Sequence, residues 1–371
     1  MSKIKSHAST ADVQIENINM VGLDREAYSK FLLSSDGATI FHSYEWCKLI
    51  GELFDFDLHF LVAMDKFGNY LAVLPLAYVK NILNKKLYSF PFSPYSGFIG
   101  DEKYFKNLFE KSIEFRESLG CKQIVIAQSP FVKLDKNPCR GAKERRWLSQ
   151  YIIVEKPQVM WSRFRPRVRK TIKRAVRKGV TVENLDLNES CKIKDIYRLL
   201  MKLSKRRGFF ILSYKDNLKI WKTLHASGYL KILIAEKDGK IIGFVSFLKF
   251  KDTIFCKEGA LSEEGKKLGA HPLIIWEGLK WSYKVGCKIF DLGPSSPLLE
   301  DGFIIDEFKG LVKFKASFGA IPARFSYFYY PNHNLDWMNN EQTVIRIKKM
   351  VRYIPDAMIF HLGTFLVKDF M

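Results

Sequence analysis

The densest run of positive charge in the chain lies between Trp161 and Val180, where the sequence is WSRFRPRVRKTIKRAVRKGV. Nine of the sixteen residues from 163 to 178 are Lys or Arg, and none is acidic. Folding does not require so many adjacent cations. We therefore expect this segment to face a polyanion such as nucleic acid, a phosphorylated molecule or an anionic membrane. The alternative is a solvated basic face on a protein whose net charge is +21.

Other kinds of reactive group leave no recognisable pattern. The chain has no G-x-S-x-G elbow and no Cys–His constellation, so we predict chemistry without a covalent nucleophile. Its six cysteines are scattered, with no C-x-x-C pair and no His at ligand spacing. This distribution predicts reduced structural thiols in a cytosolic protein rather than a metal site or a disulfide framework.

Length and composition predict a globular protein with more than one core. The 371 residues suffice for two domains, and 47% of them are hydrophobic while 27% are charged. The first residues, MSKIKSHASTADVQIEN, lack the apolar core of a secretory signal. No run of about twenty apolar residues is present, so we expect a cytoplasmic chain without a membrane-spanning helix.

Two segments resemble each other and predict an internal duplication. Residues 59–79 and 231–250 each contain two apolar runs around a polar turn with Gly68 or Gly239, the pattern of a β-hairpin. Each is followed by a predicted helix that ends at Gly120 or Gly286 and leads into a strand. The alternative is chance similarity between two generic β-α-β units. We predict two tandem α/β lobes, each with a mixed sheet.

Helices are predicted around these repeats. Val168, Ile172, Ala175 and Val176 form an apolar stripe at helical spacing, so the basic segment can dock as a helix that ends at Gly179. Further helices are expected over 192–207, over 215–227 and from Pro272. We predict a first lobe over residues 1–157, a second over 158–330, and a basic and apolar helical tail over 331–371 that packs on the first lobe.

Five phrases in order resemble the FemABX-type peptidyltransferases and their relatives from exopolysaccharide gene clusters, over roughly residues 38–330. The phrases are FHSYEWCKLI, LAVLPLAYVKN with LYSFPFSPYSGFIGD, RPRVRKTIKRAVRKGV, SKRRGFFILSYKDNL, and IFDLGPSS with FKASFGAIPARFSYFYY. The resemblance implies two tandem GNAT-like lobes and acyl transfer to an amine. Family members use aminoacyl-tRNA, or acyl-CoA, as the donor and modify cell-wall, polysaccharide or lipid precursors. No tightly bound cofactor is implied.

The chain departs from the family pattern at three places. The usual Tyr-Gly-Gly loop is Tyr95-Ser96-Gly97, which puts the acceptor contacts in doubt. The segment between Asp291 and Lys315 is long, and its insertion PSSPLLEDGFIIDEFKGL could form a lid or reshape the acceptor cleft. A coiled-coil insertion of the kind found in some tRNA-using members is absent from the sequence.

Lys315 and Asp291 are the predicted catalytic residues. A cation at Lys315 can stabilise negative charge on the transferred carbonyl or on the leaving group, and the resemblance points to the same position. Its alternative is a solvated lysine on a strand end or loop. Asp291, at the end of the predicted strand IFDLG, can orient the amine or accept its proton; the alternative is a cap before Gly293-Pro294.

The predicted substrate-binding and phosphate-binding residues are more dispersed. Arg207 matches the phosphate-binding arginine of the family by its phrase, and Arg206 is an equal candidate by chemistry. Tyr214 can stack on the acceptor, or simply pack in the core. Tyr95 lies in the expected acceptor loop, or is an ordinary loop aromatic. The candidates on the basic helix are Arg169, Lys173, Arg174 and Arg177.

The region expected to bind coenzyme A has the sequence LSEEGKKLGAHPL. Gly265 and Gly269 are present, but two glutamates precede them and the spacing differs from a pyrophosphate-binding loop. We therefore favour aminoacyl-tRNA as co-substrate over acyl-CoA, and leave the cofactor-binding residues unassigned. His271 can act as an acid or base, or can simply be a residue at the start of a helix.

The leading hypothesis is a cytoplasmic acyl or aminoacyl transferase that acts on an amine of a nucleotide- or lipid-linked cell-envelope precursor. The alternatives are an acyl-CoA-dependent N-acyltransferase of exopolysaccharide biosynthesis and a non-catalytic RNA-binding protein. In the tail, Arg346, Lys348, Lys349 and Arg352 precede an apolar stretch from Ile354 to Leu366. This tail can lie on an anionic membrane at the inner face, or pack on the first lobe. A monomer is expected, because two lobes in one chain can form a cleft alone.

Overall fold

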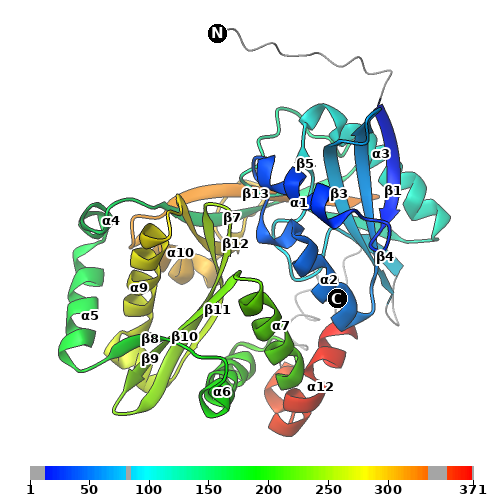
Figure 1. Ribbon diagram of the computed structural model, residues 1–371. Helices are drawn as coiled ribbons and strands as arrows, with labels where there is room; N and C mark the ends of the chain where they lie inside the picture. The colour runs from blue at the N-terminus through cyan, green and yellow to red at the C-terminus, as the bar shows by residue number, and fades with distance from the viewer. Residues whose placement is uncertain (1–12, 81–84, 333–348, 370–371) are drawn as a thin grey trace. The chain divides into compact units, whose positions relative to one another are not determined.

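The computed structural model describes residues 13–80, 85–332 and 349–369 of the chain (Figure 1). It divides into two compact units, neither of which is a single continuous segment. Unit 1 consists of Met1–Glu144 and Ser326–Asn332, and unit 2 of Arg145–Phe325 and His333–Met371. Each unit is described by itself.

Unit 1 is a mixed sheet with helices on both faces. Its strand order is β1-β2-β3-β4-β6-β13, with β4 and β6 parallel and the short β5 paired to β3. Helix α3 packs through Phe105 and Phe109 against Leu61 and Leu74 of the sheet. Tyr28 of α1 lies edge-on to Phe60 on the opposite face of β2. The elements are β1 (Val13–Asn19), α1 (Arg25–Ser34), α2 (Tyr44–Phe54), β2 (Asp57–Asp65), β3 (Tyr70–Lys80), β4 (Lys85–Tyr88), β5 (Ile99–Gly100), α3 (Phe105–Ser118), β6 (Gln123–Ala127) and the second half of β13 (Ile321–Tyr330).

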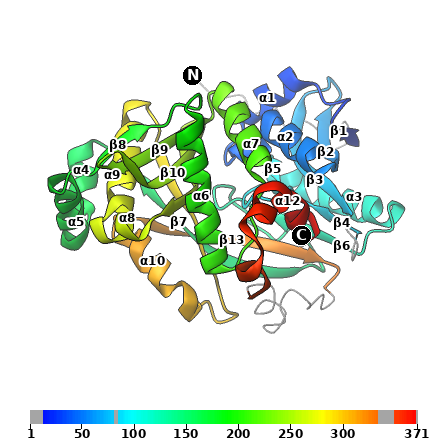
Figure 2. The ribbon, with the colours of Figure 1, turned by 90° about the horizontal axis from the view of Figure 1, so that it is seen from below.

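Unit 2 is built in the same way. Its strand order is β7-β12-β11-β10-β9-β8, and β11 and β12 are the parallel pair. Helix α9 covers one face together with α4 and α5, while α6 and α7 cover the other (Figures 1 and 2). The elements are β7 (Lys143–Ile153), α4 (Pro157–Arg163), α5 (Pro166–Arg177), β8 (Thr181–Asn184), α6 (Ser190–Arg207), α7 (Tyr214–Ala226), β9 (Leu230–Lys237), β10 (Lys240–Phe250), β11 (Thr253–Leu261), α8 (Glu263–Leu268), α9 (Ala270–Lys284), β12 (Ile289–Pro297), α10 (Lys309–Ala316) and α12 (Asp356–Asp369).

The element order confirms the predicted duplication. Unit 1 runs strand, two helices, a β-hairpin, a third strand, a helix and a strand, from β1 to β6. Unit 2 repeats this order from β8 to β12, with the short α8 added before α9. In both repeats the last helix connects two parallel strands, as a crossover connection requires. The predicted α/β class with two similar lobes is therefore confirmed.

The strands that follow the two repeats are exchanged. Strand β7 follows the first repeat along the chain, yet its residues 147–153 pair with β12 in unit 2. Strand β13 follows the second repeat, yet its residues 327–330 pair with β6 in unit 1. The boundaries expected at 157 and 330 therefore differ from those observed, because most of β7 belongs to unit 2 and the end of β13 belongs to unit 1.

The C-terminal helix packs on unit 2. Helix α12 contacts α7, and the Tyr197 hydroxyl of α6 donates a hydrogen bond to the Ile359 carbonyl at 3.3 Å. Thr364 of α12 accepts from the Ser213 amide at 3.0 Å. The expectation that the tail packs on the first lobe is thus corrected: its described contacts are with α6 and α7. Arg346 and Lys348 lie outside the described residues.

The basic helix docks as its sequence predicts, with one exception. Val168, Ile172 and Ala175 of α5 are buried in the core with α9 and the sheet. Val176 is 56% exposed, so it does not belong to the buried stripe. The predicted helices over 192–207 and 215–227 correspond to α6 and α7, and α9 begins two residues before Pro272.

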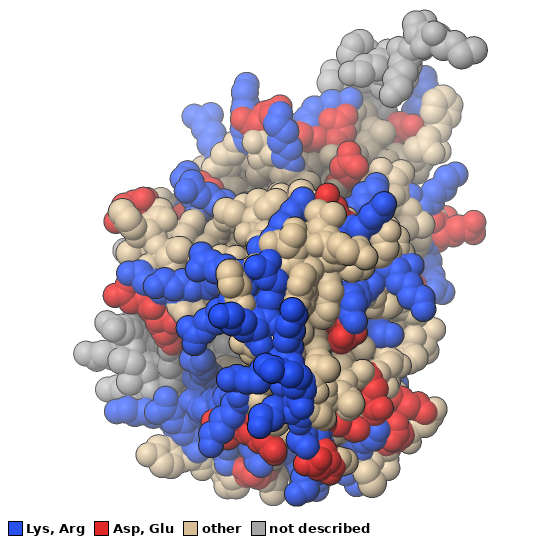
Figure 3. All heavy atoms as spheres, turned by 90° about the vertical axis from the view of Figure 1, so that its left-hand side faces the viewer, with Lys and Arg blue, Asp and Glu red and all other residues tan. Residues whose placement is uncertain are grey.

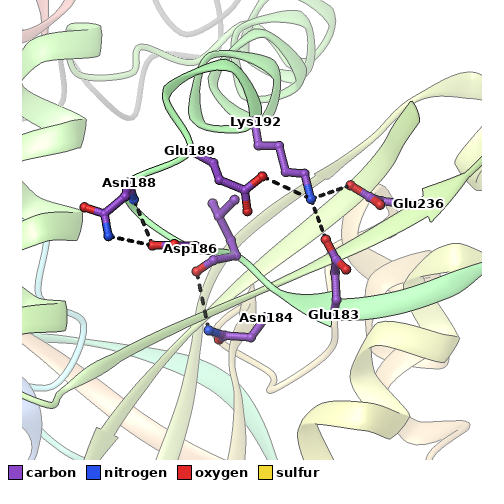
Figure 4. A network of polar contacts seen from close by, with 8 residues as sticks. Glu183, Asn184, Asp186, Asn188, Glu189, Lys192 and Glu236 are labelled. Atoms are coloured by element: carbon purple, nitrogen blue, oxygen red, sulfur yellow. Dashed lines mark hydrogen bonds and ion pairs between the residues drawn. The ribbon is translucent and has the colours of Figure 1, made fainter. Parts of the chain in front are cut away.

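A network of charges fixes the start of α6 to the sheet (Figure 4). The Lys192 ammonium lies 2.6 Å from Glu183 of β8, 3.2 Å from Glu236 of β9 and 3.4 Å from Glu189. These carboxylates raise the pKa of Lys192 above its usual value. The network orients α6, whose C-terminal end carries the predicted phosphate-binding arginines.

Candidate active site

The parallel strands β11 and β12 separate in the middle of unit 2. They pair only from Thr253 to Phe255 on β11 and from Ile289 to Asp291 on β12. Beyond this point β12 remains paired with β7, and a bulge at Lys257 shifts the register of β11 against β10. Bulges locally bend a strand, so this one accounts for the divergence. The residues at and beyond the divergence form the candidate active site.

Lys315 occupies the last turn of α10 and is only 6% exposed. Its ammonium group donates hydrogen bonds to the carbonyl oxygens of Gly293 and Pro294, at 2.7 and 2.8 Å. A lysine ammonium has three donor hydrogens, so a third remains for a ligand. The alternative of a solvated lysine on a strand end or loop is thus wrong, because the side chain is buried on a helix.

Asp291 lies within β12 at the point where the strands part, and it is 1% exposed. Its Oδ1 accepts hydrogen bonds from the Gly293 amide at 2.7 Å and from the Ser149 hydroxyl at 3.2 Å. These two bonds hold the carboxylate group in a fixed position beside β12.

Burial and charge act in opposite directions on Lys315. Desolvation lowers its pKa from 10.5 to about 8, while the charge of the Asp291 carboxylate opposes this shift. At neutral pH the lysine is therefore mostly protonated, yet it gives up its proton far more readily than an exposed lysine does. Such a group can stabilise developing negative charge and can also donate a proton.

Two further groups complete what we call the Lys315 cluster: Lys315, Asp291, His271 and Cys256. The His271 ring stacks on Phe314, with ring centroids 4.9 Å apart. Burial and the Lys315 charge lower the pKa of His271 to about 4, so its imidazole is neutral at physiological pH. Burial and Asp291 raise the pKa of the Cys256 thiol, which keeps it protonated and a poor nucleophile.

Lys315 and Asp291, both predicted from the sequence, lie close to polar residues that the sequence analysis did not predict. Ser149 bonds to Asp291, and the neighbouring Gln150 accepts from the Ser295 hydroxyl at 3.0 Å and donates to the Val312 carbonyl at 3.3 Å. Both lie on β7, in the phrase WLSQYII. Two adjacent polar residues inside the apolar second half of β7 were the sequence signal that could have identified them.

The basic helix α5 presents its charges to the surface. Figure 3 shows Lys and Arg side chains gathered on the face of the molecule that carries α5. Two of the predicted residues are held by backbone carbonyls: Arg169 donates to Ser162 at 3.1 Å, and Arg174 donates to Lys267 of α8 at 3.2 Å. Lys173 is exposed. The face is therefore partly ordered by its own contacts and suits a polyanion.

The region expected to form a degenerate coenzyme A loop is the short helix α8. The Ser262 hydroxyl caps it by accepting from the Gly265 amide at 3.0 Å, and Glu263 and Glu264 occupy its first turn. A Cβ on Gly265 would lie 2.1 Å from the Ile242 carbonyl, so close packing on β10 explains this glycine. These two carboxylates would repel a pyrophosphate at the start of the helix.

The two arginines at the end of α6 differ in their surroundings. Arg206 forms an ion pair with Glu263 of α8 at 3.0 Å. Arg207 is exposed and forms no ion pair with any residue in the described parts of the chain. Arg207 is thus the better placed of the two to bind a ligand phosphate, as its phrase predicts.

The two predicted tyrosines have structural surroundings. The Tyr214 ring stacks on Phe360 of α12 at 4.8 Å and lies edge-on to Tyr197 at 5.3 Å. Tyr95, in unit 1, is buried, and its carbonyl accepts from the Thr39 hydroxyl at 2.8 Å. These contacts support core packing for Tyr214 and loop packing for Tyr95.

Comparison with known proteins agrees with this architecture. Residues 162–309 match the model of the acetyltransferase (GNAT) domain. A crystal structure of FemX superposes with a TM-score of 0.66 and 14% sequence identity, covering 88% of this chain and 100% of that chain. This is a FemABX-like tandem-GNAT fold.

Other solved structures share this tandem-GNAT fold. The C-terminal domain of a putative lysylphosphatidylglycerol synthetase from Agrobacterium fabrum has a TM-score of 0.57 at 15% identity, covering 91% of this chain and 98% of that chain. L-PGS from Bacillus licheniformis has a TM-score of 0.51 at 14% identity, covering 89% and 96%. No curated protein matches the chain. The domain match makes the chain an acyltransferase of the GNAT type, and the Lys315 cluster lies in the unit that contains it.

Proposed function

We propose that the chain transfers an aminoacyl group from aminoacyl-tRNA to an amine of a cell-envelope precursor, and that Lys315 is the principal catalytic residue. The observation that carries this proposal is the buried Lys315 ammonium beside the divergence of β11 and β12, with two carbonyls and Asp291 holding its charge. Titratable groups with strongly shifted pKa values in such a location are typical of active sites.

In the proposed reaction, the amine nitrogen forms a bond to the acyl carbon, and the bond from that carbon to the tRNA ribose oxygen breaks. The amine loses one proton and the leaving oxygen gains one. Lys315 stabilises the negative charge that develops on the carbonyl or leaving oxygen, and its pKa of about 8 suits proton donation to the latter. Asp291 keeps Lys315 protonated. Its bonds to Gly293 and Ser149 favour this electrostatic role over that of an amine base.

The choice of donor rests on α5, α6 and α8. Arg174 and Arg206 both contact α8, and Arg207, which forms no ion pair within the described residues, follows directly. This arrangement offers cations to a phosphate backbone, whereas Glu263 and Glu264 disfavour a pyrophosphate at the start of α8. An acyl-CoA donor, as in an N-acyltransferase of exopolysaccharide biosynthesis, is the second candidate, because residues 162–309 match an acetyltransferase model. RNA binding without catalysis is the third, and would leave the Lys315 cluster without a role.

The acceptor and location follow from the same proposal. A nucleotide- or lipid-linked envelope precursor would meet a cytoplasmic enzyme at the inner face of the membrane. None of the helices in the described ranges is long and apolar enough to cross a bilayer. The tail helix α12 would supply any peripheral contact.

The test supplies purified full-length protein with labelled aminoacyl-tRNA or acyl-CoA and an amine-bearing wall precursor. For Lys315→Met we expect the transfer rate to fall about 100-fold or more, because a buried donor to the developing charge is removed. Lys313→Met, on the exposed side of the same helix, is the matched control and should retain the wild-type rate.

Product formed from charged tRNA by the wild type but not by Lys315→Met would support the proposal. Transfer only from acyl-CoA would establish the second candidate. A Lys315→Met protein that melts like the wild type and transfers within threefold of its rate would remove Lys315 from the mechanism.

A further inference from the structure

Unit 2 contains a cavity of about 580 Å³ that the predicted acyl-transfer chemistry does not account for. The long insertion after Asp291 forms one wall of it, and α10, β7 and the region around the start of β13 form the others. Ten residues line the cavity: Leu148, Gln150, Leu298, Gly302, Ile304, Val312, Ala316, Ala320, Pro322 and Arg324. The insertion therefore contributes to a cavity beside β7 and α10.

The lining is apolar except at two residues. Gln150 is 2% exposed, and both ends of its amide are already hydrogen-bonded, to Ser295 and to the Val312 carbonyl. Arg324 is exposed and forms no ion pair with any residue of the described ranges. The cavity therefore offers a ligand an apolar lining and one cationic side chain, that of Arg324.

The cavity and the Lys315 cluster use the same elements. On α10, Val312 and Ala316 line the cavity while Lys315 reaches the carbonyls of β12. On β7, Leu148 and Gln150 line the cavity while Ser149 between them bonds to Asp291. A molecule in the cavity would thus contact α10, which carries Lys315, and the face of β7 opposite to Ser149.

We propose that this cavity binds the unbranched aliphatic chain of an amphiphile whose anionic group lies at Arg324. Its volume falls in the range of about 300–1,000 Å³ that encloses small ligands, so it has room for an aliphatic chain. A branched polar ligand such as a sugar would leave its hydroxyls facing Leu148, Leu298 and Ile304 without partners. This inference deepens the proposed function, on which it rests, by assigning an aliphatic substituent to one of the two substrates.

Binding is tested by calorimetry on the full-length protein with hexanoate, octanoate and decanoate, below their critical micelle concentrations. We expect affinity to rise about three- to fourfold per added methylene, the gain for apolar surface leaving water. Decanoate that binds no tighter than hexanoate would overturn the proposal. This measurement requires no acyl transfer, so it can fail or succeed independently of the proposed function.

Substitutions then test whether the aliphatic chain of decanoate binds in this cavity. Ala316→Phe and Ala320→Phe each place a ring in the cavity and should weaken decanoate binding at least tenfold. Ala226→Phe adds the same ring at the exposed end of α7 and should leave it unchanged. Arg324→Gln should weaken the binding of decanoate but not of decanol, whereas Lys222→Gln, which removes the same charge from the exposed face of α7, should alter neither. Equal decanoate binding by wild type and both filled variants would refute the assignment.

The source of the chain is resolved with two larger probes. If the acyl donor carries it, decanoyl-CoA should bind more weakly to Ala316→Phe while acetyl-CoA is unaffected. If a lipid-linked acceptor carries it, decyl phosphate should compete with decanoate and decanoyl-CoA should not. Each result supports the cavity assignment and selects one source, and competition by neither probe would contradict it.

Discussion

Lys315 is a buried lysine, and its burial disfavours the charged form of the side chain. The side chain is almost inaccessible, and two carbonyl oxygens with one carboxylate nearby compensate only part of the desolvation, so its pKa falls to about 8. A cation held in this way is suited to meet a developing negative charge, which is the role proposed for Lys315. The neutral His271 and the protonated Cys256 leave Lys315 as the cation of the cluster.

We predict a basic limb near pH 8 in the pH dependence of the transfer rate, because the protonated form of Lys315 is the active one. Lys315→Arg, which stays charged at higher pH, should move this limb upward in whatever activity it retains. His271 has a pKa of about 4 and should contribute no limb above about pH 5. A rate that rises through pH 8 and on to pH 10 would show that Lys315 acts as a base instead.

The same pKa shift has a consequence for stability. Between pH 8 and 10.5 the folded protein has released the Lys315 proton and the unfolded chain still holds it, so folding stability rises with pH over this window. Measured against Lys315→Met, the free energy of unfolding of the wild type should therefore increase from pH 8 to pH 10. Guanidinium unfolding of both proteins at the two pH values provides the comparison. The pKa of Lys86 is also lowered to about 8. Because both proteins contain Lys86, its contribution to the pH dependence cancels in the comparison.

The sequence predicted site residues that have a charged side chain in an apolar phrase. It did not predict residues whose surroundings depend on tertiary packing. Lys315 and Asp291 follow from their charge within apolar phrases and from the family resemblance. Ser149 reaches Asp291 only because β7 pairs with β12, a partner 142 positions away that no local pattern reveals. Tyr214 was a candidate because it could stack on the acceptor, but its ring stacks on Phe360 of α12, a tertiary contact that the sequence does not reveal.

At the scale of elements, the sequence predicted helix α5 correctly but did not predict helix α8. The apolar stripe and outward charges of α5 predict its helix and its buried face. Residues 262–268 were interpreted as a degenerate loop, but they form a helix. A serine cap with two glutamates in the first turn is a recognised helix start, and this signal was available.

The exposed cations of α5 should set the salt dependence of tRNA binding. The combined variant Lys170→Gln, Lys173→Gln and Arg177→Gln should weaken binding and reduce the slope of log K against log salt by about 2 to 3, nearly one unit for each phosphate that the protein no longer neutralises. Filter binding of charged tRNA between about 50 and 200 mM salt measures the slope.

The matched control for this variant removes three exposed lysines from α6 and α7, as Lys194→Gln, Lys202→Gln and Lys222→Gln. The net charge changes equally, so only a localised binding surface would separate the two proteins. Equal slopes for both would mean that the basic face of α5 is a solvated surface.

At the scale of the whole chain, the tail helix has two apolar sides. Ile359 is buried against unit 2, while Met358, Leu362 and Phe365 are 39%, 52% and 65% exposed. Lys349 and Arg352 precede them and are exposed. A helix with this pattern suits an anionic lipid surface.

We predict that the full-length protein floats with liposomes containing anionic lipid and that Leu362→Glu with Phe365→Glu abolishes this. Deleting the tail is a poorer test, because it would also remove the partners of Tyr197 and Ser213. The control places the same charges on exposed apolar residues of unit 1, as Leu33→Glu with Phe67→Glu. Flotation that is unchanged in the tail variant would exclude the tail as the lipid-binding element.

The duplication was visible in the sequence because hairpin turns and helix ends recur at a nearly constant separation. The exchange of β7 and β13 was not visible, since no local pattern in either strand specifies which sheet it joins. Domain boundaries drawn from sequence therefore followed the repeats, and the units observed do not.

That exchange also affects how the chain is made. Strand β6 ends at Ala127, but its neighbour in unit 1 begins only at Ser326, about 200 residues later. At a synthesis rate of about 5–20 residues per second, the first lobe waits roughly 10–40 s on the ribosome with β6 as an unprotected edge. During that time the newly made β7 is the nearest strand in sequence that could pair with it. Correct folding therefore requires that the edge of β6 stay unpaired during synthesis, or that any early pairing with β7 dissociate once β13 has been synthesised.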